Sequence, residues 1–221
     1  MFQDRVQAGR ALVQELRKYS AEHPVVLGLP RGGVPVAYEV AHALGAPLDV
    51  WVVRKLGAPG HEEYGLGAIA EGEALYVDWG NVRMAGASAT EVEAIAQAQA
   101  VELARRVKLF RGSRPPPDLR NKTVILVDDG IATGGTVKAA IQGIRKAGAR
   151  RIVLAVPVAA ASSLEEIAPT VDAVVCPLAS WELYAIGQFY LDFAQTSDAK
   201  VIELLSRSRE DLAHAAPPGP G

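Results

Sequence analysis

Apolar residues along the chain follow two alternating patterns. Short runs rich in β-branched residues predict buried strands at 25–29, 48–53, 123–127, 151–156 and 171–176. Apolar residues at helical spacing predict helices at 4–20, 34–44, 90–110, 136–147, 162–168 and 198–215. Strands that alternate with helices are typical of an α/β protein with a mainly parallel sheet. We therefore expect a single domain over residues 1–215, with its core at about 21–176 and a flexible tail at 216–221.

One stretch interrupts this alternation. Residues 54–73 are polar and glycine-rich without a clear period, which is typical of a functional loop. At its end, residues 66–70 and 74–77 fit a short hairpin. Thr90 to Glu93 form a capping box for the helix at 90–110, which either covers the sheet or mediates a dimer.

Composition narrows the class of protein. The chain has 221 residues, of which 49% are hydrophobic and 22% charged, as expected of a soluble globular protein. Its net charge of −2 argues against nucleic acid and anionic membranes as partners. The single Cys176 excludes an internal disulfide and indicates a reducing compartment. With no signal-peptide pattern at the start, we expect a cytoplasmic protein.

The densest chemistry follows the strand at 123–127. Asp128 and Asp129 come directly after it, and a Gly/Thr-rich turn over Gly130–Thr136 leads into the next helix. Such a turn directs backbone N–H groups and the positive end of the helix dipole toward an anion such as phosphate. The two carboxylates could accept hydrogen bonds from sugar hydroxyls or lie near Mg²⁺. Together these features suit a ribose 5-phosphate.

Two better-known phosphate loops do not fit this stretch. A Walker A loop needs Gly-x4-Gly-Lys-Ser/Thr, whereas Lys138 lies outside the turn. A dinucleotide-binding turn has glycines directly after the strand, where this chain has Asp128 and Asp129. The stretch is therefore neither kind of nucleotide loop.

A second glycine turn follows the strand at 25–29. Arg31, Gly32 and Gly33 would let the backbone approach an anion closely, and Arg31 adds a forked cation. Lys55 follows the strand at 48–53. Because ligands of open α/β sheets bind beyond the carboxyl ends of the strands, we expect these residues to converge with the turn after Asp128.

The sequence Val124–Thr136, VILVDDGIATGGT, resembles the motif of type I phosphoribosyltransferases that binds 5-phosphoribosyl 1-pyrophosphate (PRPP). The resemblance implies a mainly parallel twisted sheet flanked by helices, with a small hood from 177–197 and the terminal helices. It implies Mg²⁺-dependent transfer of ribose 5-phosphate from PRPP to a nitrogenous base or a similar small acceptor, with release of pyrophosphate, in nucleotide salvage.

The same resemblance implies roles for individual residues. Asp128 and Asp129 would hold the ribose hydroxyls and could reach Mg²⁺ through water. Arg31 and Lys55, with Mg²⁺, would stabilise the departing pyrophosphate. Residues 54–73 would form a mobile loop that closes over PRPP and excludes water. The remaining PRPP-binding residues would be Gly32, Gly33, Gly130, Ile131, Ala132, Thr133, Gly134, Gly135 and Thr136.

An aromatic cluster marks the expected acceptor end, with five aromatic residues within 181–193. The run 186–193 loosely resembles a Gly-Tyr-x-Leu-Asp-Tyr segment of hypoxanthine/guanine phosphoribosyltransferases, with spacing that departs by one residue. On this resemblance Tyr184, together with Trp181, would stack on the base, and Asp192 would lie near the metal and pyrophosphate. The alternative is that these aromatic residues pack the hood onto the core.

Two other functions stay open. A regulator of the same fold would bind PRPP or a nucleotide without turnover, and a third possibility is transfer to an acceptor that is not a base. A local basic strip would leave room for RNA in the regulator, although the net charge argues against nucleic acid. This strip comprises Arg105, Arg106, Lys108, Arg111 and Arg114. We also expect a homodimer without a membrane partner.

Overall fold

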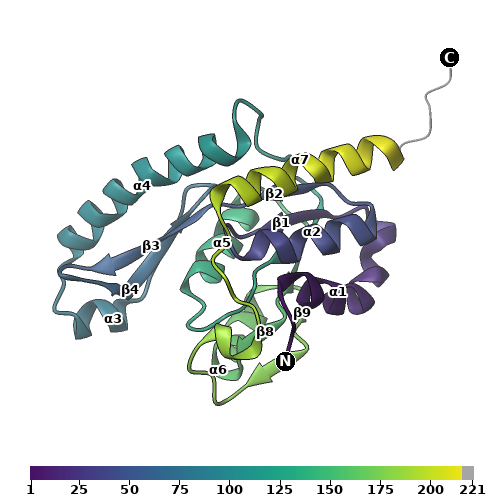
Figure 1. Cartoon of the computed structure of the whole chain (residues 1–221). Coiled ribbons are helices and arrows are strands. Elements are labelled where there is room, and N and C mark those ends of the chain that lie inside the picture. The colour runs from purple at the N-terminus through teal and green to yellow at the C-terminus, as the bar shows by residue number, and fades with distance from the viewer. Residues whose placement is uncertain (216–221) are drawn as a thin grey trace.

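The computed structural model describes residues 1–215, so the predicted tail at 216–221 lies outside the described residues. Five parallel strands form the central sheet in the order β2-β1-β6-β7-β9 (Figure 1). All residues of β1 and β6 are buried, as expected of β-branched runs covered on both faces. The parallel sheet confirms the predicted α/β class. The strands are β1 (Val25–Gly28), β2 (Leu48–Val50), β6 (Thr123–Val127), β7 (Arg151–Ala155) and β9 (Ala173–Val175).

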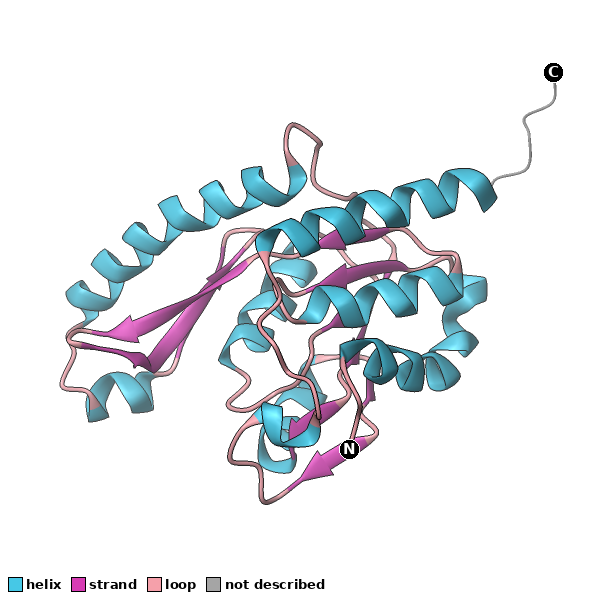
Figure 2. Ribbon diagram, in the orientation of Figure 1, coloured by secondary structure: helices cyan, strands magenta, loops and turns pink. Residues whose placement is uncertain are grey.

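Helices cover both faces of this sheet (Figure 2). Helices α1, α2 and α7 pack on one face, against Val26, Ile125 and Val153. Helices α5 and α6 pack on the other face, against Leu27 and Leu126. Alternate residues of each strand thus face opposite helix layers. The helices are α1 (Arg5–Leu16), which continues as a 3-10 helix (Arg17–Glu22), α2 (Gly33–Leu44), α5 (Gly135–Lys146), α6 (Ala161–Ile167), followed by a 3-10 turn (Ala168–Thr170), and α7 (Asp198–Ala215).

A second, antiparallel sheet projects from the body and contradicts the irregular loop expected at 54–73 (Figure 1). It consists of β3 (Val53–Ala58), β4 (His61–Ala70) and β5 (Ala74–Val77), and α3 (Trp79–Met84) follows it. We call residues 53–84 the arm. The expected hairpin at its end is confirmed, because Ala70 pairs with Ala74 and Gly67 with Val77. Whether the arm moves stays a prediction.

The periodicity of the arm is hard to see in the sequence for a physical reason. Leu56, Leu66 and Ile69 are buried in an apolar cluster on one face, with Val82 and Val92. The opposite face carries small and polar residues, and register shifts on either side of Gly57 break the alternation. Sparse apolar positions, glycines and a bulge together produced the appearance of a loop.

Helix α4 (Ala89–Arg111) lies along the arm and covers its apolar face, and a role of this helix in a dimer stays a prediction. It begins one residue before the predicted start, because Ser88 and Glu91, and not Thr90 and Glu93, form its capping box. At its other end, Arg111 is buried between two carboxylates. Its guanidinium lies 3.3 Å from Asp49 and 2.5 Å from Glu71. This contact ties the base of the arm to the core.

The segment predicted as a hood packs against the start of the chain. Strands β8 (Val158–Ala160) and β10 (Leu178–Ser180) pair in parallel, and a 3-10 helix (Ile186–Phe189) follows. The Phe2 amide donates to the Phe189 carbonyl at 2.8 Å. The Tyr190 ring lies 5.7 Å from that of Phe2 and 4.9 Å from that of Phe193. Part of the aromatic cluster therefore serves packing.

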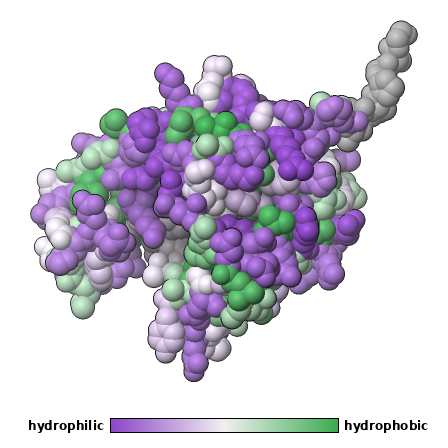
Figure 3. Space-filling model, viewed as in Figure 1, coloured by the Kyte–Doolittle hydropathy of each residue, from purple (hydrophilic) through white to green (hydrophobic). Residues whose placement is uncertain are grey.

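The surface is largely hydrophilic on the face shown in Figure 3, with scattered hydrophobic patches. Within residues 1–215, no helix combines the length and the apolar character that are needed to cross a bilayer.

Candidate active site

A cavity of about 580 Å³ lies between the carboxyl edge of the sheet and the arm. Gly28 pairs with Val127, so the turns that follow β1 and β6 begin side by side. The cavity brings together Arg31, Gly32, Lys55, Asp128, Asp129 and the whole turn Gly130–Thr136, as the sequence predicts. We call it the site cavity. Its lining is completed by Pro30, Val137, Ile186 and the arm residues Glu63, Tyr64, Gly65, Gly67, Tyr76, Asp78 and Asn81.

The turn before α5 is built as an anion cradle. Gly134 adopts a left-handed conformation with φ of 76°, which only glycine adopts readily, and α5 begins at the next residue. Ile131 anchors the turn to β8, since its amide donates to the Val158 carbonyl at 3.0 Å. The Ser163 hydroxyl donates to the Ala132 carbonyl. These bonds fix the backbone and leave Thr133 exposed to the cavity.

The two acids differ in their surroundings. Burial at the base of the cavity, and then the negative charge of Asp129, raise the pKa of Asp128 well above its ordinary value. Asp129 instead forms an ion pair with Arg5, whose Nε lies 2.8 Å from Asp129 Oδ2. Arg5 also donates to the Ala194 carbonyl at 2.8 Å and lies 4.0 Å from the centre of the Phe193 ring. Asp129 is thus held from the far side by α1.

Gly32 and Gly33 permit a close approach to these acids. A Cβ atom on Gly32 would lie 2.0 Å from Asp129 Oδ2, and one on Gly33 would lie 2.8 Å from the Val127 carbonyl oxygen. Gly33 therefore contacts the acid strand and does not line the cavity. Arg31, which follows a cis peptide bond, is 3.6 Å from Asp198 at the start of α7. Its guanidinium has an acidic partner before any anion arrives.

A family model described as the phosphoribosyl transferase domain matches residues 3–193. The chain belongs to the phosphoribosyl transferase family. This match includes every residue that the sequence assigned to the donor site. It confirms the resemblance that the motif at 124–136 indicated.

Individual relatives of this phosphoribosyl transferase domain agree. A protein of Mycobacterium tuberculosis that is named as a phosphoribosyl transferase is 46% identical over 215 residues, which is 97% of this chain. That match covers 48% of the relative, so the chain spans about half the length of the curated relatives that it matches most fully. A uracil phosphoribosyltransferase of Lactobacillus gasseri is 43% identical over 60 residues, 26% of this chain and 29% of that protein.

A solved structure extends the likeness to three dimensions. The crystal structure of TT1426 from Thermus thermophilus is 41% identical in sequence and superimposes with a TM-score of 0.78. The alignment covers 93% of this chain and 98% of that one. Most of the chain therefore shares its fold with a known structure.

The residues expected at the acceptor end of this phosphoribosyl transferase domain lie elsewhere. Trp181 is 73% exposed, Tyr184 is 91% exposed, and neither lines the site cavity. Asp192 is also outside the lining, and its carboxylate accepts from the Ala194 amide at 2.9 Å. The segment reaches the cavity only through Ile186, which packs so closely on Gly130 that a Cβ there would lie 2.5 Å away. The structure does not bring the three predicted residues to the site.

Sequence reasoning missed Arg5 and the wall that the arm supplies. An arginine in the first turn of an amphipathic helix looks like a solvated residue, so nothing in the pattern indicated its contact with Asp129. The arm residues were overlooked because their segment was interpreted as a lid. The ring of the arm residue Tyr76 lies 4.0 Å from the position that a Cβ atom on Gly135 would take.

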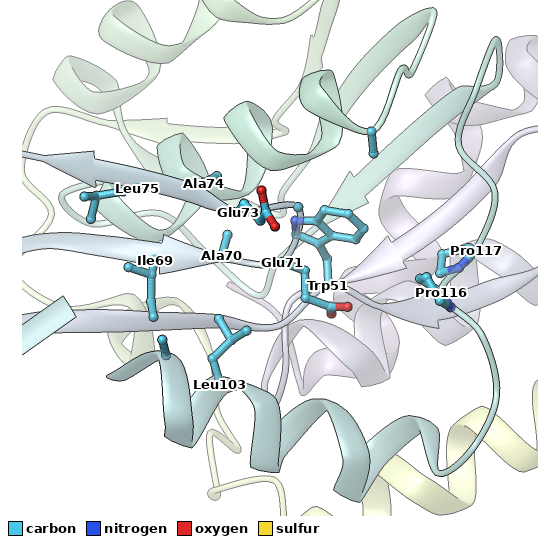
Figure 4. A pocket seen from close by; sticks show the side chains of 13 residues that line it. Trp51, Ile69, Ala70, Glu71, Glu73, Ala74, Leu75, Leu103, Pro116 and Pro117 are labelled. Atoms are coloured by element: carbon cyan, nitrogen blue, oxygen red, sulfur yellow. The ribbon is translucent and has the colours of Figure 1, made fainter. Parts of the chain in front are cut away.

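A second cavity of about 560 Å³ lies at the base of the arm (Figure 4). Trp51, Leu103, Pro116 and Pro117 contribute to its largely apolar walls. It contains none of the predicted site residues. The site cavity, which gathers the acids, the glycine turns and the cations, is therefore the candidate active site.

Proposed function

We propose that this domain binds PRPP with Mg²⁺ and transfers ribose 5-phosphate to a nitrogen-containing acceptor with release of pyrophosphate. The observation that carries the proposal is the meeting of three features in one cavity. These are the acid pair at 128–129, the anion cradle at 130–136 and the cations Arg31 and Lys55. Each complements a different part of PRPP. A cytoplasmic location and a homodimer remain predictions.

In this proposal the protein acts by position and charge. The backbone of Ala132–Thr136 and the start of α5 hold the 5-phosphate, and Asp128 accepts hydrogen bonds from the ribose hydroxyls. Arg31 leaves its contact with Asp198 and binds the pyrophosphate instead. Arg31 and Lys55 then stabilise the negative charge of this leaving group together. The acceptor nitrogen then attacks C1 of the sugar as the bond to pyrophosphate breaks. No protein nucleophile is needed.

The acid pair suits Mg²⁺ that arrives with the substrate. Among the described residues there is no cluster of three or more His, Cys, Asp or Glu side chains that could hold a metal ion. Magnesium is often bound by one or two carboxylates together with substrate phosphates and water. Asp128 and Asp129 would hold it in that way, directly or through water. When bound, the ion would neutralise charge on the pyrophosphate.

Changing the donor site should weaken binding of Mg-PRPP. Asp129→Asn removes the charge next to the ribose, and Thr133→Val removes a hydroxyl that would contact the 5-phosphate. We expect each to raise the dissociation constant about tenfold or more by isothermal titration calorimetry. Asp118→Asn and Thr170→Val make the same chemical changes away from the site cavity and should have no effect. Unchanged affinity in both site variants would refute the assignment.

A panel of purines, pyrimidines and small amines distinguishes the enzyme from the regulator. The enzyme should release pyrophosphate from PRPP with at least one of these acceptors, whereas a regulator would bind PRPP without turnover. An RNA-binding regulator has less support, because the basic strip is engaged within the protein. Arg105 and Arg106 pair with Glu102, and Arg111 is buried. If PRPP binds but no acceptor in the panel raises the release of pyrophosphate above the rate in buffer, the regulator is favoured.

A further inference from the structure

The charges that line the site cavity are not explained by PRPP alone. Asp128 and Asp129 have a role with the ribose and Mg²⁺, and Arg31 and Lys55 with the pyrophosphate. Two further carboxylates, Glu63 and Asp78, line the same cavity from the arm. PRPP carries several negative charges, so these two groups would repel it unless something else lies between. Their position suits a partner with N–H donors or positive charge.

Apart from Lys55, the arm is also the wall that the donor leaves unused. The cradle at 130–136, the turn at 30–32 and the acid pair surround PRPP, and the hood adds only the aliphatic Ile186. The acceptor must therefore lie against the arm. There is room for it, because Gly65 lines this wall and a Cβ atom on it would meet nothing within 4 Å.

The arm wall is held in place by its own hydrogen bonds. Asn81 donates from Nδ2 to the Gly65 carbonyl at 2.9 Å and accepts from the Tyr64 hydroxyl at 3.2 Å. Asp78 caps α3, since its Oδ1 accepts from the Asn81 amide at 2.9 Å, and this cap leaves Oδ2 for another partner. Tyr64, which is 40% exposed, adds an aromatic face beside these groups.

We propose that the arm recognises the acceptor, and that Glu63 and Asp78 select a planar, neutral or cationic base with exposed N–H groups while excluding acceptors that carry a carboxylate. Tyr64 provides ring contact with the same base. This inference rests on the proposed function and names the acceptor class of that site. It moves acceptor recognition from Trp181 and Tyr184 to the arm.

Two conservative variants test the inference. Asp78→Asn keeps a good helix cap, and Glu63→Gln keeps the shape of the side chain, so both should fold. Glu62→Gln is the matched control, because Glu62 neighbours Glu63 but does not line the site cavity. The probes are adenine, which has an exocyclic amine, and orotate, which has a carboxylate. The readouts are pyrophosphate release for each probe and calorimetric affinity for Mg-PRPP.

We expect the unaltered protein to use adenine in preference to orotate. Asp78→Asn and Glu63→Gln should each lower kcat/KM for adenine about tenfold, through KM, because a hydrogen bond to a charged group is lost. Affinity for Mg-PRPP should stay within about twofold, and Glu62→Gln should match the unaltered protein. A preference for orotate, or unchanged KM for adenine in both variants, would overturn the inference. A loss of Mg-PRPP affinity as large as the loss in kcat/KM for adenine would also overturn it, because Glu63 and Asp78 would then contact the donor and not the acceptor.

Failure of the proposed function would look different. If no probe is turned over, transfer is in doubt, and equilibrium binding of adenine and orotate by calorimetry, with and without Mg-PRPP, then decides the inference. Tighter binding of adenine that weakens in the two variants would support it. Equal binding of the two probes, or no binding of either, would count against it.

Discussion

Gly32→Ala should weaken PRPP binding on the order of 100-fold, corresponding to about 2.7 kcal/mol. The added methyl carbon would lie 2.0 Å from Asp129 Oδ2, which is far closer than a carbon and an oxygen atom can approach without a covalent bond. Asp129 has to move, and its ion pair with Arg5 breaks or rearranges. The same movement displaces the turn that carries Arg31. One methyl group thus disturbs the proposed ribose contact and the proposed pyrophosphate contact together.

Calorimetry with Mg-PRPP measures this effect, and thermal unfolding shows whether the variant is folded. Gly65→Ala is the matched control, because it adds a methyl group to the same cavity where nothing lies within 4 Å. It should bind PRPP within about twofold of the unaltered protein. If Gly32→Ala binds PRPP normally, then the close approach of Asp129 is not part of the donor site.

Arg111→Met should destabilise the protein by about 3–5 kcal/mol, because it leaves two carboxylates without their cation. Arg111 has 2% of its side chain exposed, and Asp49 and Glu71 have 12% and 9%. The guanidinium also donates to the Val50 carbonyl at 2.9 Å. Removing one member of a buried ionic group costs more than the group itself contributes, since the remaining charges stay poorly solvated.

Urea denaturation measures the change, with a fall in melting temperature of roughly 6–20 °C as a second readout. Adding Asp49→Asn and Glu71→Gln to Arg111→Met should recover part of the lost stability, because the unbalanced charges disappear. Arg105→Met, in an exposed pair with Glu102 on the same helix, should cause no measurable change. Equal effects of Arg111→Met and Arg105→Met would show that the buried charges are compensated in another way.

The sequence was sufficient to predict that the residues assigned to the donor lie together in one cavity. The run at 123–127 is apolar throughout, apart from its first residue, the acids follow it directly, and the glycines of the next turn are a local requirement of its backbone. Such local rules do not depend on distant parts of the chain. The convergence with Arg31 and Lys55 could be predicted because parallel strands direct their carboxyl ends to one edge.

The features that were missed depend on distant contacts. The arm has one apolar face that α4 covers, and neither periodicity nor turn residues indicated this pairing. The aromatic residues near 190 were equally compatible with packing and with stacking on a base. The structure decides between the two for Tyr190 and Phe193, because the Tyr190 ring packs against the rings of Phe2 and Phe193. Arg5 had no signal, because its partner is far away in the chain.

The contacts of Arg5 also bear on when the site can form during synthesis. Arg5 is separated by 124 residues from Asp129 and by 189 residues from Ala194, to which it also donates a hydrogen bond. Contacts of such long sequence separation form slowly, since the loops they close are long. A chain emerging from the ribosome from its first residue cannot complete the contacts around Asp129 until Ala194 has been made. Arg5 must therefore wait for the 189 residues that separate it from Ala194 before this corner of the site is assembled.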